Sequence, residues 1–155
     1  MFFEDSTAAF ANIRRSLAAG GRLSFLCWRS MAENAWVTVP RDAVLPLLPE
    51  VEPPQPGAPG PFRFAAPDTL LPILEAAGFR GIGRAPVGRV VRVGEPIEAA
   101  ADFVATRGRV ARLLREREPA LQEAALKIIR QLFAERFGAG PVDLGAACWL
   151  VSARA

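Results

Sequence analysis

The residue types that usually perform covalent catalysis or bind metals are sparse in this chain. It has no His, and its two cysteines, Cys27 and Cys148, each stand beside a Trp in an apolar stretch. A Ser-His-Asp or Cys-His mechanism is therefore excluded within these residues, and a zinc cluster lacks ligands without His or a CxxC pair. We interpret both cysteines as small buried hydrophobic residues in a reducing compartment. The sequence predicts no metal site, and its catalytic residues stay unknown.

The elements that would position any binding residue begin with a helix and a strand. Asp5 is a plausible N-cap, an apolar helical spacing follows it, and Gly20-Gly21 ends the helix. Leu23–Trp28 is a nearly continuous apolar run, which is typical of a strand buried on both faces of a parallel sheet. Helix, glycine turn and buried strand form the second half of a βαβ unit. The preceding strand would end at about Met1-Phe2-Phe3.

The rest of the chain alternates between predicted helices and strands within a single expected domain, residues 1–155. Pro49–Pro61 is dense in Pro and Gly, which predicts a semi-rigid loop or lid. A linker between two domains is the alternative. Residues 34–48 are expected to be helical, with interruptions at Pro40 and Pro46, and residues 62–65 are expected to be extended. Further helical segments are expected at 67–77, 96–107, 110–114 and 119–137, and further strands at 81–93 and 146–153. In the helix at 119–137, the residues expected to face inward are Leu121, Ala125, Ile128, Leu132 and Phe133.

Composition predicts a globular cytoplasmic protein. Hydrophobic residues make up 51% and charged residues 23% of 155, and no apolar run has the roughly 18 residues of a membrane span. We expect no signal peptide and no membrane partner, because Glu4 and Asp5 follow the first apolar residues. The net charge of +3 comes from scattered arginines, so we expect a solvated surface and no nucleic-acid partner. Nucleic-acid binding remains a weaker alternative, which a steep salt dependence would identify.

Two blocks of the sequence resemble a known enzyme family. Residues 1–17, followed by Gly20-Gly21-Arg22-Leu23 and Phe25-Leu26-Cys27-Trp28-Arg29, are similar to the segment from the fourth to the fifth strand of class I S-adenosylmethionine-dependent methyltransferases. The continuation Ala32-Glu33-Asn34-Ala35-Trp36-Val37-Thr38-Val39-Pro40 resembles a subgroup that acts on small molecules. Leu74-Glu75-Ala76-Ala77-Gly78-Phe79 resembles the turn before the sixth strand, and 148–153 stands where the seventh, antiparallel strand would lie.

The resemblance implies a fold and a function for the chain. The fold would be α/β, a partial Rossmann-like sheet with the C-terminal strands in the order five, seven, six, mixed in direction and flanked by helices. The family uses S-adenosylmethionine, so the chain would be the C-terminal part of a methyltransferase with a small-molecule acceptor.

The resemblance also implies a site at the carboxyl ends of the strands, where open α/β sheets bind ligands. The acceptor pocket would be lined by Trp28, Arg29, Asn34, Trp36, Phe62 and Phe64, and Phe2 and Phe3 would lie at the cofactor. Glu33 is the nearest carboxylate, and we expect a surface role for it. Ordinary packing is the alternative for each aromatic residue.

The sequence departs from the family in the residues that would hold the cofactor. Gly81-Ile82-Gly83 precedes its strand and does not complete GxGxxG, and Gly138-Ala139-Gly140 follows a helix. We therefore expect this chain alone to bind no S-adenosylmethionine and to be inactive. The alternative is a non-catalytic interaction module that dimerises. Without a fourth strand, Leu23–Trp28 would have an unpaired edge, so we predict a homodimer through this strand or through Met1–Phe3.

Overall fold

The computed structural model describes residues 1–48 and 58–155, and these residues divide into two compact units. Unit 1 contains residues 1–33, 58–88 and 147–155, and unit 2 contains residues 34–48 and 89–146. Most of the loop predicted at 49–61 lies outside the described residues. No described helix has both the length and the hydropathy to cross a membrane.

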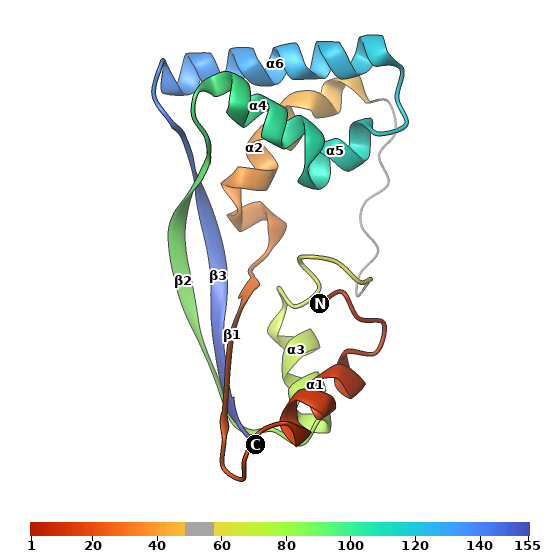
Figure 1. The fold of residues 1–155 in the computed structure, drawn as a ribbon, viewed down its shortest axis with the longest axis vertical. Helices are drawn as coiled ribbons and strands as arrows, with labels where there is room; N and C mark the ends of the chain where they lie inside the picture. The colour runs from red at the N-terminus through yellow and green to blue at the C-terminus, as the bar shows by residue number, and fades with distance from the viewer. Residues whose placement is uncertain (49–57) are drawn as a thin grey trace. The chain divides into compact units, whose positions relative to one another are not determined.

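The chain is α/β, with six α-helices and a three-stranded sheet in its described residues (Figure 1). The elements are α1 Ser6–Arg15, β1 Arg22–Trp28, η1 Met31–Glu33, α2 Ala35–Val44, η2 Leu45–Leu47, α3 Pro67–Ala76, β2 Arg80–Gly94, α4 Ile97–Thr106, α5 Gly108–Leu114, α6 Pro119–Phe137 and β3 Val142–Arg154. The predicted helices at 67–77, 96–107 and 119–137 and the predicted strands are confirmed, with shifts at their ends.

The three strands have the order β1-β3-β2 and are antiparallel. The predicted order is observed, since the last strand lies between the other two. The predicted mixed direction is wrong, because both neighbour pairs contain β3, which runs opposite to β1 and β2. In the register of β1 and β3, Phe25 lies opposite Val151 and Cys27 lies opposite Trp149.

β1 differs from the doubly buried strand that its apolar run predicted. It stands at one end of the strand order, and its burial alternates along the strand. Cys27 is buried, whereas Leu26 is 56% exposed. The prediction failed because an apolar run does not show whether one face or both faces of a strand will be covered.

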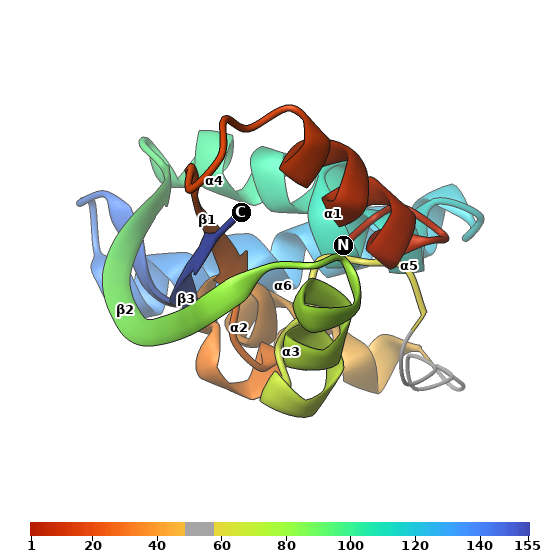
Figure 2. The ribbon, with the colours of Figure 1, turned by 90° about the horizontal axis from the view of Figure 1, so that it is seen from below.

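Unit 1 packs α1 and α3 against one face of the sheet (Figures 1 and 2). The predicted N-cap is confirmed, since the Ala8 N–H donates to Asp5 Oδ1 at 2.8 Å. α1 ends at Arg15, earlier than predicted, and Gly20, at a φ of 72°, lies in the turn that leads into β1. The apolar core of the unit comprises Phe10, Cys27, Phe64, Leu70, Leu74, Ala77, Phe79, Val151 and Ala153.

Unit 2 encloses its core mainly with helices. α6 starts with Pro119 in its first turn and ends at Gly138, which has a φ of 61°. Its buried residues are Ala125, Ile129 and Phe133, so Ile129 takes the central position that was predicted for Ile128. The spacing of four residues keeps these side chains on one face of the helix. The core also includes Val44, Val104, Val110, Leu114, Val142 and Leu144.

Candidate functional site

The residues predicted at the site are divided between the two units. Unit 1 holds Phe2, Phe3, Trp28, Arg29, Phe62 and Phe64, and unit 2 holds Asn34 and Trp36. We build the candidate site from unit 1, where several of the predicted residues share one constellation of contacts.

A turn at residues 61–64 is the centre of this constellation. The sequence predicted an extended segment at 62–65, which is wrong. The Gly60 N–H donates to the Met1 carbonyl at 3.1 Å, and Arg63 donates to the carbonyl of Phe3 at 2.5 Å and to that of Glu4 at 3.3 Å. These partners are about sixty positions away in sequence, so no local pattern could predict the turn. Hydrogen bonds from Arg63 and Gly60 to backbone carbonyls hold the turn against the N-terminal segment.

The same turn is also fastened to the carboxyl end of β1 and its neighbour. The Cys27 thiol donates to the Phe64 carbonyl at 3.9 Å, and the Trp149 indole donates to the Ala65 carbonyl at 3.0 Å. Phe64 is 2% exposed, and its ring centroid lies 5.9 Å from that of Phe10. The Phe64 side chain therefore belongs to the core of unit 1 and offers a ligand little surface.

Phe2 and Phe3 have the most accessible rings of the constellation. Their side chains are 68% and 65% exposed, while Trp28 and Phe62 are half-buried. The Phe3 carbonyl is held by Arg63, so the backbone here is anchored while the rings remain outside the core. We call Phe2, Phe3, Phe62 and Arg63 the turn cluster. It combines accessible Phe rings with one guanidinium, whose terminal nitrogens donate to the carbonyls of Phe3 and Glu4.

The charges beside the turn cluster are paired and do not form a catalytic acid or base. Arg29 forms an ion pair with Glu33, and the Ser30 hydroxyl donates to Glu33 Oε2 at 2.7 Å. The hydrogen bond from Ser30 and the charge of Arg29 lower the pKa of Glu33, so it stays ionised. Arg29 and Arg84 also lie 4.7 and 4.4 Å from the centre of the Trp149 ring, within the range of cation–π contact.

The two cysteines are poor nucleophiles. Burial raises the pKa of Cys27 to about 11 and also raises the pKa of Cys148. Both thiols are therefore protonated near neutral pH, and a thiol attacks far more slowly than a thiolate. Within residues 1–48 and 58–155, no group of three potential ligands could hold a metal ion.

Asn34 and Trp36 have a structural arrangement of their own in unit 2. The Trp36 indole donates to Asn34 Oδ1 at 3.1 Å, and the Asn34 carbonyl accepts the Val37 N–H at 2.9 Å. Asn34 is fully buried, and Trp36 is partly buried against the core of unit 2. Asn34 thus starts α2 and fixes the orientation of Trp36.

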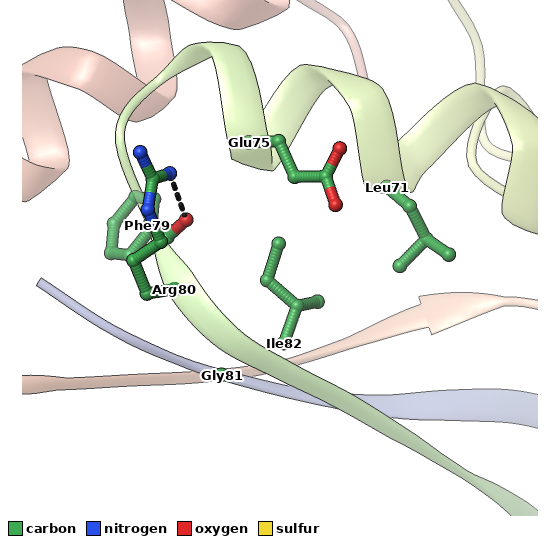
Figure 3. A pocket seen from close by; sticks show the side chains of 6 residues that line it. All are labelled: Leu71, Glu75, Phe79, Arg80, Gly81 and Ile82. Carbon is green, nitrogen blue, oxygen red and sulfur yellow. Dashed lines mark hydrogen bonds between the residues drawn. The ribbon is translucent and has the colours of Figure 1, made fainter.

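The sequence did not indicate a shallow hollow of about 480 Å³ between α3 and β2 (Figure 3). It is lined by Leu71, Glu75, Phe79, Arg80, Gly81 and Ile82. Arg80 donates to the Phe79 carbonyl at 2.9 Å, and Glu75 lies across the hollow from it. One carboxylate, one guanidinium and apolar walls can bind a ligand, but the hollow contains no nucleophile.

Within the described residues, no glycine-rich turn follows a strand. Two described strands lead into a helix, and neither link offers a cradle for a nucleotide-type ligand. The link after β1 contains no glycine. At Gly94, the last residue of β2, there is no free space beside the backbone, because a Cβ there would lie 2.7 Å from backbone atoms of Ala100. The space that a glycine-rich turn would give to a ligand is filled here by α4.

Comparison with known proteins gives the chain no family. No protein-family model matches it, and no curated protein matches it.

Proposed function

We propose that this chain forms the C-terminal part of a methyltransferase that uses S-adenosylmethionine and a small-molecule acceptor. The observation that carries the proposal is the strand order β1-β3-β2 with the last strand antiparallel between the other two. A helix precedes each of β1 and β2, as the resemblance implies for the fifth and sixth strands. In a plain succession of strands β1 would lie beside β2, because consecutive strands more often lie side by side.

In this proposal the turn cluster borders the acceptor site. It lies against the end of β1, the position where open α/β sheets bind ligands. Phe62 would contact the flat part of the acceptor, and Phe2 and Phe3 would lie on the side of the cofactor, as the resemblance implies. Arg63 would hold the backbone that carries these two rings. Methyl transfer is a displacement that depends on alignment and exclusion of water, so aromatic contacts can contribute without a general base.

In this proposal, the cofactor binds to the complete methyltransferase domain and not to residues 1–155 alone. The test is calorimetry with S-adenosylhomocysteine on residues 1–155 and on the same chain extended by whatever its reading frame encodes upstream. The proposal expects no binding by residues 1–155 and micromolar binding by a longer chain whose added residues include a glycine-rich turn. Micromolar binding by residues 1–155, or no binding by such a longer chain, would contradict the proposal.

A second candidate function is supported by a different observation. β1 stands at the edge of the sheet, and Leu26 and Leu150, which lie opposite each other, are 56% and 40% exposed. An open strand edge beside apolar surface favours association with another chain. The chain would then be a non-catalytic interaction module. A reading frame closed by a stop codon just upstream would favour this function over the first.

A further inference from the structure

Along β1, the backbone N–H and C=O groups of successive residues point alternately toward β3 and away from it. The Arg29 N–H donates to the Ala147 carbonyl at 3.0 Å, and the Ala155 N–H donates to the Gly21 carbonyl at 2.8 Å. Both bonds continue the register in which Trp28 faces Cys148 and Arg22 faces Arg154. Because antiparallel ladders alternate, the odd-numbered residues of β1 bond to β3. The N–H and C=O groups of Arg22, Ser24 and Leu26 therefore point outward at the edge.

This edge lacks the features that usually prevent strands from pairing. β1 contains no Pro and no acidic residue, and Arg22 is its one charged residue. Among the described strands none pairs with its outer side. Natural edge strands are commonly protected by charges, prolines, bulges or a covering element. The outward groups of β1 form a template for one more strand.

We propose that β1 pairs in antiparallel fashion with β1 of a second copy of this chain, with the two-fold axis at Phe25. In this register Ser24 lies opposite Leu26 of the second copy, and Arg22 lies opposite Trp28. The outward N–H and C=O groups of Ser24 and Leu26 then satisfy one another across the axis. The two three-stranded sheets become one sheet of six strands.

The side chains of β1 favour this register over the alternatives. Its one charge, Arg22, meets the aromatic ring of Trp28, which is a favourable partner for a guanidinium. A parallel pairing in register would place Arg22 against Arg22, and like charges directly opposite are destabilising. A pairing centred on Ser24 would place Arg22 opposite Leu26. Of these three pairings, the one with its axis at Phe25 gives the charge an aromatic neighbour.

The proposed pairing also covers exposed apolar surface. Leu26 and Leu150 lie opposite each other, so their side chains share the sheet face away from Cys27 and the core of unit 1. With the axis at Phe25, the Leu26 side chains of the two copies become diagonal neighbours on that face. In Met1–Phe3, the other contact predicted from the sequence, the backbone carbonyls of Met1 and Phe3 already accept hydrogen bonds from Gly60 and Arg63. The structure therefore favours β1 over the N-terminal segment.

The inference rests on the second candidate function, because the fourth strand that the methyltransferase proposal implies would occupy the same edge of β1. It is tested first by sedimentation of residues 1–155 between about 1 and 100 μM, where we expect a reversible dimer. Leu26→Lys should weaken the dimer by at least about tenfold, because a charge at the new contact must be desolvated. Leu150→Lys is the matched control, because it adds the same charge to the same face one strand inward. It should change the dissociation constant much less than Leu26→Lys does.

Cross-linking tests the register directly. In a Cys148→Ser background, Ser24→Cys with Leu26→Cys should form inter-chain disulfides on mild oxidation, since cysteines opposite each other lie within disulfide range. Arg22→Cys with Leu26→Cys should not form them, although this pair would cross-link if the axis were at Ser24. Circular dichroism should show a native spectrum for every variant, and Ser24→Lys replaces Leu26→Lys if that variant is unfolded.

The opposite results would overturn the inference. A monomer at 100 μM would show that the edge does not pair. A stronger effect of Leu150→Lys than of Leu26→Lys would show that copies associate through the open face and not through the edge. Cross-linking of the Arg22 pair alone would place the axis elsewhere. None of these outcomes bears on the binding of S-adenosylhomocysteine, so failure here leaves the proposed function standing.

Discussion

The two units differ in how far each covers its apolar side chains. Unit 2 packs four helices around a core in which Val44, Ile129 and Phe133 are fully buried. Unit 1 covers one face of its sheet and leaves an edge and part of the other face open. Of the large hydrophobic residues that are exposed in the described chain, unit 1 holds Phe2, Phe3, Ile13, Leu26 and Leu150, and unit 2 holds Val90 and Phe103. This contrast supports our proposals, which place the contact with a ligand or with another chain in unit 1.

The largest effect should come from the core of unit 2. Phe133→Ala should lower the free energy of unfolding by about 3–5 kcal/mol, because it leaves a cavity in a closed core. Leu26→Ala in unit 1 should change the stability of the monomer by less than about 0.5 kcal/mol, since this side chain is mostly exposed. Urea unfolding at low protein concentration measures both. Equal losses of unfolding free energy in the two variants would contradict the difference in packing between the two units.

A smaller loss is expected where α4 approaches the end of β2. Gly94→Ala would place a Cβ 2.7 Å from backbone atoms of Ala100, which cannot move independently of the helix. We expect a destabilisation of about 1–3 kcal/mol. Gly145→Ala is the control in the same unit, because its Cβ would lie at an ordinary 3.9 Å from the Ala35 side chain. A thermal shift for Gly145→Ala as large as that for Gly94→Ala would contradict the close packing described for unit 2.

The helix that covers the sheet of unit 1 depends on its N-cap. Asp5→Ala should cost about 1 kcal/mol, because the Ala8 N–H loses its acceptor. Glu4→Ala, one residue earlier, should cost nothing measurable in the same unfolding experiment. If the two substitutions had the same effect, the cap would contribute no stability and α1 would be held by packing alone.

The smallest effect should be a gain of stability in unit 2. The Nε of Arg109 is buried without a hydrogen-bond acceptor, and burial together with Arg112 lowers the pKa of its guanidinium. Arg109→Met should therefore raise the free energy of unfolding by about 0.5–1 kcal/mol. Arg130→Met, which removes an exposed ion pair with Asp102, should lower it slightly or leave it unchanged. A loss of stability in Arg109→Met would mean that its charge is balanced within the folded chain.

The sequence predicted the fold best where local signals coincide. Pro119 and Gly138 mark the ends of α6, and Pro67 marks the start of α3, so the boundaries followed from residues that can occupy those positions. Local signals could not show which faces of an element would be covered by other parts of the chain. β1 has the composition of a doubly buried strand, yet it stands at an edge, because burial depends on which other strands are present.

The candidate site was predictable only in part. Phe62 was expected in the acceptor pocket and Phe2 and Phe3 at the cofactor, and the turn at 61–64 lies against the N-terminal segment and the carboxyl end of β1. Arg63 was missed, because its role comes from carbonyls of Phe3 and Glu4 that are distant in sequence. Phe64 was expected to face a ligand, but its side chain is buried in the core of unit 1, whereas the other residues of the turn are half-buried. The hollow beside Glu75 and Arg80 gave no signal, since it arises from the angle between α3 and β2 (Figure 3).

Amide hydrogen exchange along β1 tests most directly whether unit 1 presents an unfilled strand position. At a concentration where the chain is monomeric, the N–H groups of Leu23, Phe25 and Cys27 should exchange slowly, and those of Ser24 and Leu26 should exchange fast. At a concentration where the dimer forms, Ser24 and Leu26 should become slow as well. Slow exchange of Ser24 and Leu26 in the monomer would show that the edge is already satisfied within the chain. Fast exchange at every concentration would show that no second strand pairs with it.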